Sequence, residues 1–174
     1  INSDHRLNYP QVSDFLEGKK KAEELGLEGL EETLKNMQEL MNILNEKRNK
    51  RGNIDFDIVE TKVILDEKGK VIDIKPEERR VANKIIEEFM IAANETVAKE
   101  YFMKDLPFVY RVHEKPKREK MFYLAEFLKR FDLYINPDNV SPADIANVLN
   151  QLKGKKESAL ISNIVLRTMQ KARY

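Results

Sequence analysis

The sequence predicts an α+β fold that is mostly helical, with one long central helix and a small antiparallel β-hairpin. Apolar residues recur at helical spacing over most of the chain, and they alternate with polar residues over one stretch that contains a tight-turn sequence. With 174 residues, of which 41% are hydrophobic, the chain is long enough to bury a core. No repeat or flexible linker interrupts it, so we expect a single structural unit.

Two helices are predicted before residue 52. Pro10 suits the start of a short helix over residues 11–17, because a first-turn proline loses no hydrogen bond. A long helix is predicted over residues 27–50, where an apolar stripe follows the helical period: Leu30, Leu34, Met37, Met41 and Leu44. Gly52 ends this helix.

The hairpin is predicted over residues 54–74. Residues 54–66 form its first strand, residues 66–69 a tight turn, and residues 71–74 the second strand. Asp55 and Asp57 point the same way on the first strand, so they are either solvated side chains or a pair that can bind a metal ion.

The central helix is predicted over residues 77–103. Pro76 lies at its start, and one wide apolar face carries Val81, Ala82, Ile85, Ile86, Phe89, Ala92, Ala93, Thr96 and Val97. The opposite side is predicted to be a solvated stripe of Lys84, Glu88, Glu95 and Lys99. Glu87 and Asn94 lie off this stripe, so they are either surface residues or a polar pair that faces a cleft.

In the last third of the chain, the sequence predicts one short strand and three helices. The strand covers residues 108–113, and the helices cover residues 116–130, 142–153 and 158–172. Ser141 caps the second of these helices, because Pro142 suits its first position and Asp144 its first turn.

The composition narrows the class of protein. The absence of cysteine excludes disulfides and zinc–thiolate sites and predicts a reducing, cytoplasmic location. The net charge of +1 means that any binding of nucleic acid must rest on local patches. The chain has two histidines that lie far apart, no glycine-rich phosphate loop, and no apolar run long enough to span a bilayer.

Several segments match the motifs of one known family. In chain order they are RLNY (6–9), RGNIDFD (51–57), LDEKGK (65–70), IIEEFMIAAN (85–94), YRVHEKP (110–116) and LRTMQKA (166–172). Together they resemble the catalytic RNB domain of the ribonuclease II family, over residues 1–174. Residues 54–57 and 110–116 resemble the ribonuclease R branch more than ribonuclease II itself.

This resemblance implies a hydrolytic 3′-to-5′ exoribonuclease that threads single-stranded RNA into a channel and releases nucleoside monophosphates. In the family, the aspartates that hold Mg²⁺ lie upstream of the RLNY motif, and an arginine segment that assists the transition state lies downstream of the LRTMQKA motif. We therefore expect residues 1–174 to be an internal part of an RNB domain, with no catalytic residue and no metal ligand of its own, and to be inactive alone.

The resemblance implies three RNA-binding residues. Tyr9 matches the family tyrosine near the 3′ end of the RNA. Phe56 matches a phenylalanine against which the last bases stack, although a core position in the hairpin is the alternative. Glu87 matches the glutamate that reads the ribose 2′-hydroxyl, which favours the cleft-facing interpretation of this residue.

Two further expectations concern partners. The partner that the resemblance implies is single-stranded RNA, and no membrane partner is expected. An uncovered strand edge in the hairpin predicts weak self-association. A non-catalytic RNA-binding or interaction domain on the same scaffold is the alternative function.

Overall fold

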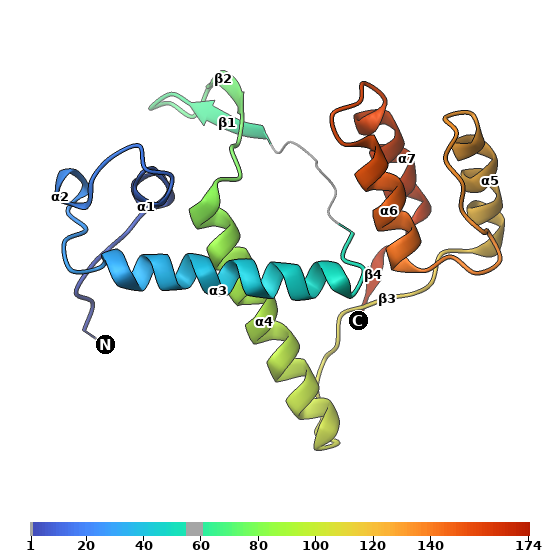
Figure 1. Ribbon diagram of the computed structural model, residues 1–174, viewed down its shortest axis with the longest axis horizontal. Helices are drawn as coiled ribbons and strands as arrows, with labels where there is room; N and C mark the ends of the chain where they lie inside the picture. The colour runs from blue at the N-terminus through green and yellow to red at the C-terminus, as the bar shows by residue number, and fades with distance from the viewer. Residues whose placement is uncertain (1, 55–60) are drawn as a thin grey trace. The chain divides into compact units, whose positions relative to one another are not determined.

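The structure, a computed structural model, describes residues 2–54 and 61–174 (Figure 1). These residues fall into two compact units, where the sequence predicts one. The first unit is Ile1–Lys47 with Glu60–Leu106, and the second is Arg48–Val59 with Pro107–Tyr174. The division follows the apolar residues, because each unit has its own buried cluster. The predicted α+β class, mostly helical with a small antiparallel hairpin, is confirmed.

The first unit holds most of the long elements. They are α1 (Tyr9–Leu16), α2 (Ala22–Leu25), α3 (Glu31–Lys50), β1 (Thr61–Leu65), β2 (Val71–Pro76) and α4 (Val81–Met103). Its core is small and centres on Leu27, which is fully buried, with Val12, Ala22, Leu34 and Ala82 around it. This core joins α1, α2, α3 and the first turn of α4.

α1 begins two residues earlier than predicted because of its cap. The Asn8 side chain accepts a hydrogen bond from the Gln11 backbone N–H at 2.9 Å, and Asn8 N–H donates to the Gln11 side chain at 3.4 Å. Pro10 lies in the first turn, as the sequence predicts. The cap therefore fixes Tyr9 as the first residue of the helix.

The hairpin is confirmed as an antiparallel pair, in which Thr61 lies opposite Pro76 and Val63 opposite Ile74. Asp66 shapes its turn, because its Oδ1 accepts from the backbone N–H groups of Lys68 and Lys70, both at 2.9 Å. The predicted strand 54–66 is described only from Thr61 onward. The large apolar side chains of the two strands are mostly exposed, and self-association through this hairpin stays a prediction.

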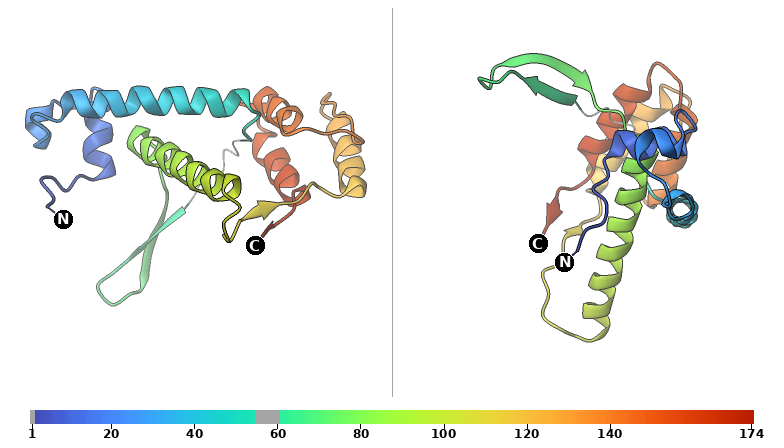
Figure 2. Two further views of the ribbon diagram at one scale, coloured as in Figure 1. Left: turned by 90° about the horizontal axis from the view of Figure 1, so that it is seen from below. Right: turned by 90° about the vertical axis from the view of Figure 1, so that its left-hand side faces the viewer.

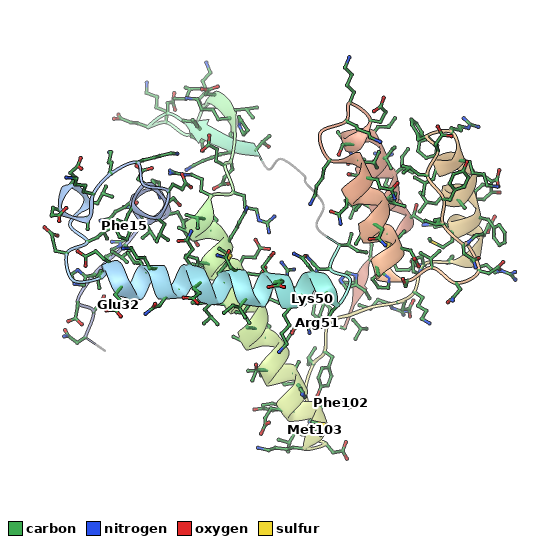
Figure 3. All side chains as sticks on the ribbon, in the orientation of Figure 1. Phe15, Glu32, Lys50, Arg51, Phe102 and Met103 are labelled. Carbon is green, nitrogen blue, oxygen red and sulfur yellow. The ribbon has the colours of Figure 1, made fainter. Side chains whose placement is uncertain are left out.

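α4 differs from its prediction in two ways. It begins at Val81 rather than residue 77, because Pro76 ends β2 and Arg80 is the N-cap residue. Its apolar face is buried only in its first half, at Ala82 and Ile85, whereas Val97 is 45% exposed. α1 lies beside the first turns of α4, and the second half extends past α3 (Figures 1 and 2). Phe102 and Met103 lie at the far end of the helix and are largely exposed (Figure 3).

The second unit is a group of three helices with a small two-stranded sheet. The elements are β3 (Val112–His113), α5 (Arg118–Lys129), α6 (Pro142–Leu152), α7 (Ser158–Thr168) and β4 (Ala172–Arg173). α7 packs against both α5 and α6. Leu128, Ile161 and Val165 are completely buried at the centre of this unit.

Two predictions in the second unit need correction. The strand expected over residues 108–113 is only Val112–His113, and the last helix ends at Thr168 rather than residue 172. The reason is shared, because Ala172–Arg173 leaves the helix to pair with β3. The predicted cap of α6 is confirmed, since Ser141 Oγ accepts from Asp144 N–H at 3.2 Å.

Gly52 is the one glycine at which an added side chain would clash with a neighbouring residue. It has a φ of 88°, and a Cβ there would lie 2.9 Å from the backbone nitrogen of Ala143. Gly52 thus lets the segment that follows α3, which belongs to the second unit, approach the start of α6. None of the helices in the described residues is long and apolar enough to cross a bilayer.

Candidate nucleic-acid interface

A cleft of about 600 Å³ lies in the first unit, between the segment before α1, α3 and the first turns of α4. Its walls are almost entirely apolar. They are formed by Leu7, Asn8, Tyr9, Pro10, Val12, Leu34, Met37, Ala82, Ile85 and Ile86. Residues 7–9 belong to the RLNY motif, and Ile85 and Ile86 belong to the IIEEFMIAAN motif. Two motifs that are far apart in the sequence therefore line the same cleft.

Tyr9, for which the motif resemblance implies contact with RNA, is one of the residues that line the cleft. Its side chain remains 47% exposed although it lines the cleft. The Asn8 cap holds its backbone at the start of α1. An aromatic ring at an open apolar wall can stack on any of the nucleobases.

Glu87 follows the cleft residue Ile86 on α4, and its side chain is 36% exposed. Its carboxylate pairs with Arg79 through two hydrogen bonds. Arg79 Nε donates to Oε2 at 2.8 Å and Arg79 Nη2 donates to Oε1 at 2.7 Å. Both oxygens are thus held by one planar guanidinium. Glu87 is not itself one of the residues that line the cleft.

The predicted position of Glu88 on a solvated stripe is wrong. Glu88 is only 3% exposed, and its Oε1 accepts a hydrogen bond from Asn45 Nδ2 of α3 at 2.9 Å. The reason is that α3 crosses α4 on this side of the helix, so a face that looks polar in the sequence is covered by a neighbour. Asn94, which the sequence pairs with Glu87, is exposed on the second half of α4.

Arg80 joins α1 to the start of α4. Its Nη2 donates to Asp14 Oδ1 at 2.6 Å and to Glu17 Oε2 at 2.7 Å, and its Nε donates to Glu17 Oε1 at 3.1 Å. Hydrogen bonds from Arg80, and then from Lys19, lower the pKa of Glu17 to about 2.

A buried hydrogen bond lies beside this ion network. The backbone N–H of Ala82 donates to the fully buried Ser13 Oγ at 3.2 Å. Together with Arg80 it holds α1, which begins with Tyr9, against the turn that precedes Glu87. Sequence reasoning missed Arg79, Arg80 and Asn45. The two consecutive arginines were a signal for the first two, whereas no signal in the sequence pointed to Asn45.

Phe56 lies outside the described residues, as do Asp55 and Asp57, so the prediction for Phe56 stays a prediction. Within residues 2–54 and 61–174, no three acidic or histidine side chains come together to hold a metal ion. The described residues therefore do not fit a magnesium site, and we assign them no metal-dependent step.

Comparison with known proteins agrees with the motifs. The RNB domain model matches residues 1–174. This chain belongs to the RNB domain family. The ribonuclease R of Thermotoga maritima is 39% identical over 176 residues, which cover all of this chain and 24% of that protein. Ribonuclease R 1 of Lactococcus lactis is 36% identical and also matches the whole chain, with 21% of its own length covered.

A solved structure supports the same assignment. Mycoplasma genitalium RNase R in complex with ribose methylated single-stranded RNA matches with a TM-score of 0.83 and 30% identity, over 94% of this chain and 26% of that chain. The chain thus spans about a quarter of the length of these relatives. The predicted resemblance to the ribonuclease R branch is confirmed.

Proposed function

We propose that this RNB chain is the RNA-holding part of a longer 3′-to-5′ exoribonuclease of the ribonuclease R type. The enzyme degrades single-stranded RNA to nucleoside monophosphates in the cytoplasm. The observation that carries the proposal is the apolar cleft, because two family motifs form its walls and one of them continues directly into Glu87. The relatives that match the chain are ribonucleases R, and one of them is described in complex with single-stranded RNA.

In this proposal Tyr9 stacks on a base near the 3′ end of the RNA, and Glu87 accepts a hydrogen bond from a ribose 2′-hydroxyl. Phe56 supplies a second stacking surface. An ionised carboxylate only accepts hydrogen bonds, so Glu87 can pair with a ribose hydroxyl and gains nothing from the C–H of deoxyribose. Mg²⁺ is the proposed cofactor, with ligands contributed by other parts of the longer enzyme.

Replacing Glu87 by alanine tests the proposal. In the full-length protein we expect Glu87→Ala to narrow the preference for RNA over DNA by about one to two powers of ten, because a hydrogen bond to a charged acceptor contributes roughly 1.5–3 kcal/mol. The measurement is the ratio of dissociation constants for matched RNA and DNA oligomers, taken by fluorescence anisotropy with EDTA so that no strand is cut.

Glu95→Ala is the matched control, because Glu95 is an exposed acid on the same helix, two turns after Glu87. It is expected to leave the ratio unchanged. Glu88→Ala is unsuitable as a control since Glu88 is buried. An unchanged ratio in Glu87→Ala, with the fold intact, would remove Glu87 from the proposed site.

A further inference from the structure

Two consecutive arginines precede α4, and their side chains bind different partners. Arg80 pairs with Asp14 of α1 and with Glu17, the residue that follows this helix, whereas Arg79 pairs with Glu87 on α4 itself. The Arg80 pairs are partly shielded, with side-chain exposures of 18% for Arg80, 22% for Asp14 and 29% for Glu17. The backbone that carries Arg79 is therefore anchored to α1 through the residue next to it.

The Arg79 guanidinium holds the Glu87 carboxylate at both of its oxygens. The guanidinium uses one acceptor position on each carboxylate oxygen, at 2.7 and 2.8 Å. A carboxylate offers about four such positions, so this one guanidinium uses two of them. Arg79 thus restricts the orientation of the carboxylate. A lysine keeps the charge but lacks the planar fork that sets this orientation.

The anchored arginines also connect the two residues that we assign to RNA. α1 begins with Tyr9, and it is the helix to which Arg80 binds. From that anchored turn, Arg79 reaches the Glu87 carboxylate, eight residues along the chain. The position of the Glu87 carboxylate relative to Tyr9 thus depends on the Arg79 contact as well as on α4.

We propose that Arg79 is a positioning residue for Glu87, which orients its carboxylate toward the ribose 2′-hydroxyl and so helps to set the preference for RNA over DNA. This inference rests on the proposed function of Glu87. A direct contact between Arg79 and a backbone phosphate is the competing explanation, and it makes a different prediction. Phosphates are common to RNA and DNA, so loss of such a contact weakens both by the same factor.

The test compares the RNA-to-DNA ratio of dissociation constants in the full-length protein without divalent metal ions. The variants are Arg79→Ala, Arg79→Lys, Glu87→Ala and the double variant Arg79→Ala/Glu87→Ala. We expect each Arg79 variant to narrow the ratio about two- to fivefold, the scale of an exposed ion pair. The double variant is expected to have the same ratio as Glu87→Ala alone, because Arg79 acts on the ratio only through Glu87.

Lys84→Ala is the control, since it removes an exposed cation from the same helix. We expect it to leave the ratio unchanged, and thermal unfolding of every variant checks that the fold is intact. The inference is overturned if Arg79→Ala or Arg79→Lys has the same RNA-to-DNA ratio of dissociation constants as the wild type. It is also overturned if Arg79→Ala narrows this ratio as much in the Glu87→Ala background as it does in the wild type. If Glu87→Ala itself leaves the ratio unchanged, it is the proposed role of Glu87 that fails.

Discussion

Leu128→Ala is expected to lower the free energy of unfolding of the second unit by about 2–5 kcal/mol, because it leaves a cavity in a closed core. Leu128 is completely buried on α5, in the cluster that also contains Ile161 and Val165 of α7. Urea unfolding followed by circular dichroism measures the change. The large effect is expected because this buried cluster contains residues of all three helices of the second unit, α5, α6 and α7.

Leu160→Ala provides the matched comparison, since Leu160 makes the same change in volume on α7 but is 54% exposed. We expect it to change the free energy of unfolding by no more than about 0.5 kcal/mol. Similar losses in the two variants would mean that the second unit is not organised around the α5–α7 contact.

Glu88→Ala has the second largest expected effect, a loss of about 1–3 kcal/mol in the free energy of unfolding of the first unit. Glu88 is 3% exposed and accepts from Asn45, so its removal breaks a hydrogen bond between α3 and α4 and leaves a void between them. Urea denaturation of the variant beside the wild type gives the difference.

Two further variants show whether the hydrogen bond to Asn45 accounts for this loss of stability. Glu88→Gln keeps an oxygen that can accept from Asn45, so we expect it to retain more stability than Glu88→Ala. Glu95→Ala removes an exposed acid from the same helix and is expected to have an effect within about 0.5 kcal/mol. Equal stability of Glu88→Ala and Glu95→Ala would contradict the buried contact.

Local sequence signals predicted the elements well where the determinants lie close together in the chain. Pro10 and the Ser141–Asp144 pair located helix starts, and Asp66 with Gly69 located the hairpin turn, since each acts within a few residues. Helix ends were less predictable where a distant partner decides them. The last helix stops at Thr168 because residues 172–173 pair with β3, a contact far away in the sequence.

The candidate site was predicted only in part, because some of its contacts also depend on partners that are far apart in the sequence. Motif resemblance predicts that Tyr9 and Glu87 bind RNA, and that role stays a prediction, whereas the structure places Tyr9 on the cleft wall. Helical periodicity then assigned the wrong environment to Glu88, because the pattern shows which residues share a face but not that Asn45 of another helix covers it. The Arg79 and Arg80 contacts depend on side chains that meet only after folding.

Photocrosslinking of RNA to the full-length protein tests the central claim most directly. The probe is a single-stranded RNA with 4-thiouridine in its last nucleotides, bound with EDTA, and mass spectrometry identifies the crosslinked tryptic peptides. We expect crosslinks in the peptide of residues 7–19, which contains Tyr9, and in the peptide of residues 85–99, which contains Glu87. RNA that binds and crosslinks elsewhere, with neither peptide labelled, would contradict the claim that this cleft holds the 3′ end of the RNA.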